Sequence, residues 1–310
     1  MKISGFTIIK NAEIFDFPVV EAIRSILDAV DEFVVAVGES DDNTEALIRS
    51  IDSPKIRIVN TVWDTKKYSG GGVILAQQTD VALRACTGDW CFYVQSDEVM
   101  HESGIPIVRA ACEKYLDDPH IDGFTFKYVH LYGDYRRVID FLHFAYPREI
   151  RIVRNRPDIH SWRDAQSFRI NSGFDGDYTK KEGTEKLRCV GLDALMFHYG
   201  WSRDPRLLTG KVNHMKRIYD GKEEAGTETH HDYGNLSVFP LYNGSQPALM
   251  HDRIEAMSWG DYLRYDGPWP EHRKIRGRKY RFLRFIESRL LGRRRLLGFK
   301  NYISAGRFRF

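Results

Sequence analysis

The sequence has little cysteine, with four in 310 residues, and no two of them form a Cys-x-x-Cys pair. Structural zinc sites and disulfide-stapled secreted domains depend on closely spaced cysteines. Neither kind of protein is expected here, and we interpret Cys86, Cys91, Cys112 and Cys189 as buried, reduced thiols.

Long hydrophobic runs are also missing. No stretch approaches the roughly 18 consecutive apolar residues of a membrane-spanning helix. The N-terminal segment becomes too polar after Ile9 to be a signal peptide, so we expect a cytoplasmic protein. Hydrophobic residues make up 42% and charged residues 29% of the chain. This ordinary globular composition allows one large core, or a core with a subdomain.

Negative charge is scarce at the C-terminal end. Residues 271–310 carry 14 Lys or Arg and two Glu, a net charge of +12, which leaves −9 for residues 1–270 of a chain whose total is +3. Apolar residues recur there near one face of a predicted helix, with arginines between them: Phe282, Leu283, Phe285, Ile286, Leu290 and Leu291. A basic amphipathic helix is typical of binding to anionic lipid headgroups. Docking onto the acidic remainder of the chain is an alternative. Nucleic-acid binding is a third, without a recognised module to support it.

The first 105 residues alternate between short apolar runs and segments with helical spacing. Buried strands are predicted at residues 2–10, 33–38, 55–63 and 90–95, and helices at 17–30, 45–51 and 71–86. This alternation is typical of an α/β fold with a parallel, doubly wound sheet and helices on both faces. Ligands of such sheets bind beyond the carboxyl ends of the strands. We therefore expect the polar segments 38–44 and 95–98 to face one crevice.

The remaining chain is less regular and shows no internal repeat. We expect a helix at 107–116, one or two strands within 123–141, a strand at 148–155, loops and short strands over 157–186, a short strand and a helix within 194–219, and a polar loop over 221–240.

Two acids, Asp97 and Glu98, stand side by side where the fourth predicted strand ends. At a strand end followed by a turn, both carboxylates can approach one ion. Sites with few oxygen ligands from the protein suit Mg²⁺ or Mn²⁺. A solvated acidic turn is the other interpretation, and the spacing alone leaves both open.

Four segments occur in an order that resembles the GT-A glycosyltransferases of family 2: TIIKNAE, VGESDDNT, ALRACTGDW and QSDEV. In that family the second strand commonly ends in a DDGSTDGT-like loop, and the fourth in an Asp-x-Asp motif followed by an acid. The likeness covers about residues 1–105, and weaker matches at RDAQ (163–166) and HYGW (198–201) extend it further.

The resemblance implies a nucleotide-diphosphate sugar donor and a Mn²⁺ or Mg²⁺ cofactor. Asp97 matches the last Asp of the Asp-x-Asp motif, which binds the metal on the donor diphosphate. Gln95 replaces the first Asp and brings no charge, so Glu98 is the acid that would compensate. His198 matches a late histidine that completes the metal or diphosphate site in many GT-A enzymes. A core histidine at a strand end is the alternative.

The resemblance also implies residues that bind the donor. The expected set is Thr7, Lys10, Asn11, Glu13, Glu39, Gln95, Ser96, Asp97 and Arg163. The family's usual acidic pair in the second-strand loop falls on Val37 and Gly38, which leaves Glu39 as the nearest acid. We interpret Asp42 and Thr44 as capping the helix that follows them.

Asp164 is the expected catalytic base. In an inverting transfer, an acid removes the proton of the acceptor hydroxyl as that hydroxyl attacks the anomeric carbon. The family places this acid on a loop or helix start well after the metal motif, which suits Asp164. A helix-capping role for Asp164 is the alternative, with Glu149 and Asp140 in reserve as bases.

Several other polar residues have weaker interpretations. Arg203 and Lys211 are expected to neutralise the leaving diphosphate. Arg163 and Arg169 either bind a phosphate or pair with acids. The group His230-His231-Asp232 is a candidate metal site, but clustered histidines in a loop more often have no specific role.

The leading hypothesis is an inverting, metal-assisted glycosyltransferase of bacterial surface polysaccharide or glycoconjugate synthesis. Residues 1–215 would form the GT-A (Rossmann-like) domain, 216–270 an acceptor-side loop region, and 271–310 a basic helical extension. The acceptor would be a saccharide or a lipid-linked saccharide, and the basic extension would bind the protein peripherally to the inner face of the cell membrane.

Two other functions were weighed against this hypothesis. A nucleotidyltransferase would show a glycine-rich, basic loop after the first strand, and KNAEIFDFP is not such a loop. A non-catalytic protein that binds nucleotide sugars or glycans stays open because Gln95 departs from the metal motif.

Overall fold

The computed structural model describes residues 1–220, 230–291 and 300–310. Residues 221–229 of the polar loop expected over 221–240, and residues 292–299 of the basic segment, lie outside this part. The first seven elements alternate strand and helix, as predicted: β1 Ile3–Ile9, α1 Val19–Leu27, β2 Glu32–Gly38, α2 Thr44–Arg49, β3 Ile56–Thr61, α3 Val73–Arg84 and β4 Trp90–Tyr93. β1 lies between β2 and β4, β3 lies beside β2, and these pairings are all parallel.

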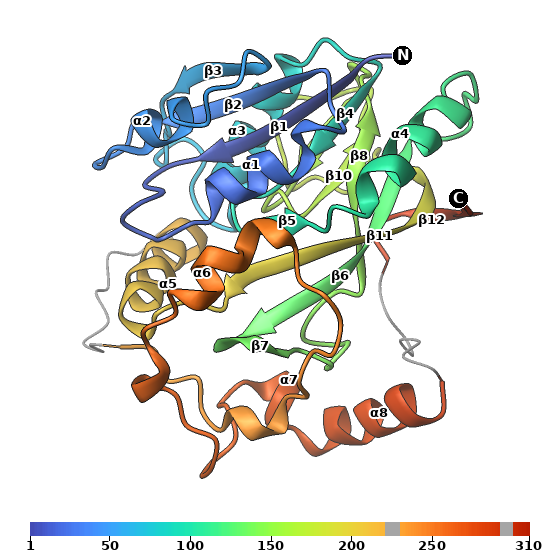
Figure 1. Cartoon of the computed structure of the whole chain (residues 1–310). Coiled ribbons are helices and arrows are strands. Elements are labelled where there is room, and N and C mark those ends of the chain that lie inside the picture. The colour runs from blue at the N-terminus through green and yellow to red at the C-terminus, as the bar shows by residue number, and fades with distance from the viewer. Residues whose placement is uncertain (221–229, 292–299) are drawn as a thin grey trace.

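Helices cover both faces of this parallel half of the sheet (Figure 1). One apolar core includes the buried faces of α1 and α2, and the other includes residues of α3. β1 is buried along its whole length because both of its faces are covered. Gly5 lets the neighbouring strand approach, since a Cβ there would lie 2.5 Å from the Phe33 ring.

The second half of the chain extends the same sheet. Its elements up to residue 220 are β5 Glu98–Met100, α4 Gly104–Lys114, β6 Gly123–Tyr132, β7 Asp134–Val138, β8 Arg148–Arg154, β9 Ile159–Trp162, β10 Ser167–Ile170, β11 Arg188–Trp201 and α5 Pro205–Asp220. β8 runs antiparallel between β4 and β6, whereas β11 is parallel to β6 and antiparallel to β5. The α/β class with a mostly parallel sheet is confirmed, but the sheet is mixed.

The remaining elements follow the site-bearing half of the chain: η1 Leu236–Val238, η2 Ala248–Met250, α6 His251–Glu255, η3 Gly260–Tyr262, α7 Arg273–Arg276, α8 Arg278–Arg289 and β12 Ile303–Arg307. The strand order across the described sheet is β12-β11-β6-β8-β4-β1-β2-β3, with β5 paired to β11 and β7 to β6.

Two expected boundaries need correction. The boundary expected after residue 215 falls inside α5, which continues to Asp220. The C-terminal segment contains the expected helix, α8, but it ends in a strand that pairs in parallel with β11. Backbone hydrogen bonds from Ile303 to Leu187 and from Phe308 to Gly191 hold β12 on this edge.

Helix α8 contacts the rest of the molecule through polar side chains, and Leu283 and Ile286 are partly buried. The Arg284 guanidinium donates to the Asp140 carboxylate at 2.8 Å, and the Glu287 carboxylate lies 2.9 Å from the His143 ring. Phe282, Phe285 and Leu290 are 65%, 59% and 69% exposed. The helix lies at the end of the molecule opposite β3 (Figure 1).

The four cysteines are buried and form no disulfide, as expected. Among the described helices, none combines the length and the apolar composition that crossing a bilayer requires.

Candidate functional site

Two cavities meet beside the carboxyl ends of β1 and β4. The first, which we call the strand-end cavity, has a volume of about 620 Å³ and lies between these strand ends and α5. The second, the adjoining cavity, has a volume of about 1380 Å³ and lies over β6 and β8. Side chains shared by both linings mark their junction: His130, Ile139, Ala145, Tyr146, Asp164, Gln166 and Tyr219.

Most of the predicted site residues line one of these two cavities. The predicted residues that line the strand-end cavity are Lys10, Gln95, Ser96, Asp97, Asp164 and His198. Arg163 lines the adjoining cavity. The other predicted residues, Thr7, Asn11, Glu13, Glu39 and Glu98, line neither of the two.

Asn11 and Glu13 join two loops instead of facing the cavity. The Asn11 side chain accepts from the Asp41 backbone N–H at 2.8 Å and donates to the Asp41 carboxylate at 3.2 Å. One Glu13 carboxylate oxygen accepts the backbone N–H of Asn43 at 3.2 Å. Thr7 is buried within β1, and Glu39 is exposed outside both cavities. The direct donor contacts expected of these four residues do not fit their positions.

Asp42 has a local role but is not the expected helix cap, because the N-cap of α2 is Asn43 and no side chain caps it. Its carboxylate accepts the backbone N–H groups of Glu13, Ile14 and Thr44 at 2.9, 3.0 and 3.0 Å. Burial raises the pKa of Asp42, but the bonds from Thr44 and these backbone amides outweigh it and lower the pKa. The loops after β1 and β2 are thereby fixed to each other.

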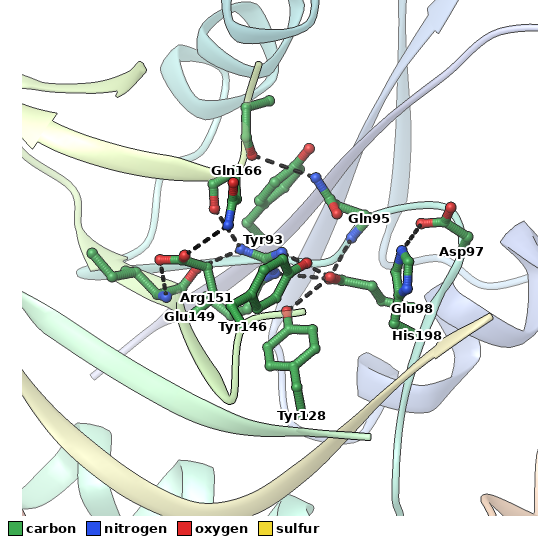
Figure 2. A network of polar contacts seen from close by, with 12 residues as sticks. Tyr93, Gln95, Asp97, Glu98, Tyr128, Tyr146, Glu149, Arg151, Gln166 and His198 are labelled. Carbon is green, nitrogen blue, oxygen red and sulfur yellow. Dashed lines mark hydrogen bonds and ion pairs between the residues drawn. The ribbon is translucent and has the colours of Figure 1, made fainter. Parts of the chain in front are cut away.

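Glu98 does not fit the metal-ligand role expected of it. Both of its oxygens face the Arg151 guanidinium at 2.7 Å, and the Tyr128 hydroxyl donates to one of them at 2.8 Å (Figure 2). Glu98 and Arg151 are both fully buried. A carboxylate held bidentately by a guanidinium is already neutralised, so Glu98 is a structural anion.

Arg151 also fixes the loop that carries Asp164. Its Nη1 donates to the carbonyl oxygens of Ile150 at 2.7 Å and Gln166 at 3.0 Å. The Gln95 side-chain amide donates to the Ala165 carbonyl at 3.4 Å. The turn after β4 and the loop at 163–166 are therefore held at a fixed separation from each other.

Asp97 lies between the Lys211 ammonium and the His198 ring. The Lys211 ammonium, from α5, donates to Asp97 Oδ2 at 2.9 Å and to the Gly200 carbonyl at 3.2 Å. His198 Nε2 lies 3.8 Å from Asp97 Oδ1 (Figure 2). Burial raises the pKa of the Asp97 carboxyl, but Lys211, His198 and Arg203 together bring that pKa well below its usual value. Asp97 is therefore a carboxylate at neutral pH.

A second histidine fixes the tautomer of His198. His130 is in register with His198 on the neighbouring strand, and burial lowers the pKa of His130 to about 3. The neutral His130 ring donates from Nε2 to the Tyr146 carbonyl at 2.8 Å, because a carbonyl oxygen can only accept. Its Nδ1 must then accept from His198 Nδ1–H, 3.3 Å away. His198 Nε2 is left with a lone pair beside Asp97.

This arrangement fits a divalent metal ion with few protein ligands. Asp97 offers a carboxylate and His198 a nitrogen lone pair, while the remaining ligands of Mg²⁺ or Mn²⁺ commonly come from phosphates and water. Gly200 keeps the space between them open, since a Cβ there would lie 2.6 Å from His198 Nε2 and 2.7 Å from Asp97 Oδ2. The described residues contain no group of three or more His, Cys, Asp or Glu side chains suited to a metal.

Asp164 lies on a strained loop between the two cavities. Its neighbours Arg163 and Ala165 have φ angles of 58° and 60°, a region that residues other than glycine seldom adopt and that often marks functional sites. The Tyr219 hydroxyl of α5 donates to Asp164 Oδ2 at 2.9 Å. Gly72 packs flat against this pair, since a Cβ there would lie 2.8 Å from the Asp164 side chain.

The reserve bases are less favourably placed. The Asp140 carboxylate pairs with Arg284 of α8. Glu149 lines the adjoining cavity but is buried, which raises its pKa, and accepts hydrogen bonds from Ile150 N–H at 2.9 Å and Ser167 Oγ at 3.1 Å.

An aromatic ring lies beside each arginine of the predicted phosphate sites, and the Arg169 guanidinium also donates to Thr184 Oγ1 at 2.6 Å. Arg163 and Arg169 lie 4.5 and 4.9 Å from the Trp162 ring, and neither forms an ion pair within the described part of the chain. Arg203 is 1% exposed and lies 4.7 Å from the Phe17 ring. Its Nη1 and Nη2 have no hydrogen-bond partner among the described residues.

Sequence reasoning missed Arg151, His130 and Tyr219. The available signal for His130 was the pairing of two similar strand segments, KYVHLY and MFHYGW, each with one histidine among aromatics. No local signal marks Arg151 or Tyr219, whose partners Glu98 and Asp164 are 53 and 55 residues away.

No protein-family model matches the chain, and no curated protein matches it. Among solved structures, TarS of S. aureus aligns with 72% of this chain at 16% identity and a TM-score of 0.40. Residues 1–349 of TarS in complex with UDP-GlcNAc give the same values. Glucosyl-3-phosphoglycerate synthase from Mycobacterium tuberculosis, in complex with Mn²⁺, UDP and phosphoglyceric acid, aligns with 42% at 22% identity and a TM-score of 0.29.

This chain spans 41% of the length of TarS, 68% of the 1–349 piece and 43% of the synthase.

Proposed function

We propose that this protein is a glycosyltransferase that moves a sugar from a nucleotide-diphosphate donor in the strand-end cavity to an acceptor hydroxyl in the adjoining cavity. The observation that carries the proposal is that the Asp164 side chain lines both cavities. A base that removes the acceptor proton must stand where the two substrates meet.

The strand-end cavity suits a nucleotide diphosphate. Lys211 and the buried Arg203 lie beside Asp97, so positive charge exceeds negative charge around this carboxylate. Aromatic walls suited to a base or sugar ring complete the cavity: Phe15, Phe17, Trp63 and Tyr93. Asp97 and His198 would hold a Mn²⁺ or Mg²⁺ ion, which supplies positive charge to the leaving diphosphate.

The reaction follows from the position of Asp164. Its carboxylate accepts the proton of the acceptor hydroxyl while that oxygen bonds to the anomeric carbon. The bond from this carbon to the diphosphate oxygen breaks, and the nucleoside diphosphate leaves with the electron pair. Lys211 stabilises the charge that develops on the leaving group. Attack from the face opposite the diphosphate inverts the anomeric carbon.

The acceptor and its cellular setting are proposed from the C-terminal helix and the sequence resemblance. Exposed phenylalanines among the arginines of α8 support peripheral binding to an anionic membrane surface. A saccharide or lipid-linked saccharide acceptor at the cytoplasmic face, in bacterial surface polysaccharide or glycoconjugate synthesis by a family 2 enzyme, is consistent with such binding.

The test of the proposal is nucleoside diphosphate release from a panel of nucleotide sugars, beginning with UDP-glucose and UDP-GlcNAc, with Mn²⁺ and a mixture of saccharide acceptors. Asp164→Asn should lower kcat about 10²- to 10⁴-fold, the usual contribution of a general base, while donor binding persists. Asp175→Asn makes the same chemical change on an exposed loop and should leave kcat unchanged. Equal turnover in the wild type and Asp164→Asn would show that Asp164 is not the catalytic base. Donor binding without turnover would favour a non-catalytic nucleotide-sugar-binding protein.

A further inference from the structure

The Asp97 site already contains a cation. The Lys211 ammonium lies 2.9 Å from Asp97 Oδ2 and 3.2 Å from the Gly200 carbonyl oxygen. These oxygens and the His198 lone pair surround the opening that Gly200 leaves. An ammonium and a divalent metal cannot both occupy this side of one carboxylate. The side chain of Lys211 therefore takes the place where a metal would approach Asp97 Oδ2.

The charges around the site oppose metal binding when no donor is present. Arg203 is buried close enough to Asp97 to lower its pKa, and its Nη1 and Nη2 have no partner in the described residues. One carboxylate thus faces two cations. A metal ion arriving alone would add two positive charges to a pocket that already has an excess. A diphosphate reverses this balance, because it brings negative charge for the metal and a new partner for Lys211.

We propose that Lys211 acts as a resident cation that excludes the metal from Asp97 until a diphosphate binds. Metal and diphosphate then enter together, and the ammonium moves from Asp97 to a diphosphate oxygen. The metal and the diphosphate each raise the affinity for the other, as reciprocal coupling requires. The inference rests on the proposed function only for the origin of the diphosphate.

The position of Lys211 on α5 makes this exchange feasible. The ammonium is at the end of a flexible four-carbon chain, so it can change partners without movement of the helix. Lys211 also lines the strand-end cavity, so that a diphosphate bound there is within reach of the same side chain. Lys66, exposed in the segment between β3 and α3, lines neither cavity and provides a matched control.

The test measures Mn²⁺ binding to the donor-free protein by electron paramagnetic resonance of the free ion. Lys211→Met should bind Mn²⁺ at least about tenfold more tightly than the wild type, within the usual range of coupling between sites. Lys211→Arg keeps the charge and should bind like the wild type, and so should Lys66→Met, which removes an exposed lysine outside both cavities. Adding Asp97→Asn to Lys211→Met should abolish the gain. Inorganic pyrophosphate should tighten Mn²⁺ binding in the wild type more than in Lys211→Met.

Equal Mn²⁺ affinity in the wild type and Lys211→Met would overturn the inference, as would a gain that survives Asp97→Asn. Lys211→Gln provides a second neutral variant if Lys211→Met does not fold by circular dichroism. Because no donor and no turnover enter the measurement, its outcome is separate from that of the proposed function. A protein without glycosyltransferase activity would still show the gain if Lys211 excludes the metal.

Discussion

Two adjacent carboxylates of this protein, Asp97 and Glu98, serve different purposes because their partners differ. Glu98 is neutralised by Arg151 in a fully buried pair. Asp97 faces a lysine that can leave it and a histidine whose Nε2 lies 3.8 Å away. The chemistry of the strand end therefore depends on one acid, and the other fixes the structure around it.

The Glu98–Arg151 pair yields a stability prediction. Arg151→Met leaves a buried carboxylate without its cation, which costs about 3–5 kcal/mol of unfolding free energy. Urea denaturation followed by circular dichroism measures this loss. The double variant Glu98→Leu with Arg151→Met removes both charges and should recover much of the stability. A loss below about 1 kcal/mol in Arg151→Met would contradict a structural role for the pair.

The predicted residues that line the strand-end cavity have chemistry visible in a short segment. Asp97 follows a buried strand, and His198 precedes a glycine at another strand end. A short segment does not show in which direction the side chains of the other predicted residues point. Asn11 and Glu13 turn toward the next loop, and Glu98 turns toward an arginine 53 residues later, because contacts formed only in the folded chain decide these directions.

Among the helices and strands, α8 is unusual because polar residues make its contacts with the rest of the protein. Its Arg284 and Glu287 contact the segment after β7, while Phe282 and Phe285 are exposed. An amphipathic helix that packs on its own protein normally buries its apolar stripe. In α8, Phe282, Phe285 and Leu290 are exposed, whereas Leu283, Ile286 and Leu291 are partly buried. The three exposed residues and the neighbouring arginines are available to a lipid surface.

This orientation predicts membrane binding. The full-length protein should sediment with vesicles of phosphatidylserine and phosphatidylcholine, and binding should weaken as salt is raised. Phe282→Ser with Phe285→Ser should reduce the bound fraction severalfold without changing donor affinity. Val62→Ser with Leu249→Ser alters two other exposed apolar residues and serves as the control. Equal sedimentation of the two double variants would exclude α8 as the lipid-binding element.

The elements that local patterns predicted best are those of the parallel half. Their apolar runs and helical spacings are complete within each segment, so periodicity identifies them. β12 has no such signal, because Ile303–Arg307 is mostly exposed and is a strand only through its hydrogen bonds to β11. The antiparallel placement of β8 between β4 and β6 likewise depends on pairing between distant segments.

In the molecule as a whole, α5 connects the two halves of the site. Lys211 contacts Asp97 in the strand-end cavity, and Tyr219 contacts Asp164 at the junction with the adjoining cavity. The two residues are eight positions apart, about 12 Å along a helix. One rigid helix therefore sets the distance between the proposed diphosphate site and the proposed base.

The central claim is that the strand end around Asp97 binds a nucleotide-diphosphate sugar. The most direct measurement is the thermal shift produced by a panel of nucleotide sugars, with and without Mn²⁺, on the wild type and Asp97→Asn. A ligand present at a hundred times its Kd stabilises the folded state by about 2.7 kcal/mol, which raises the melting temperature visibly. We expect at least one nucleotide-diphosphate sugar to stabilise the wild type in the presence of Mn²⁺ and to lose this effect in Asp97→Asn. If no donor stabilises the wild type under either condition, or if Asp97→Asn responds equally, the strand end is not a donor site.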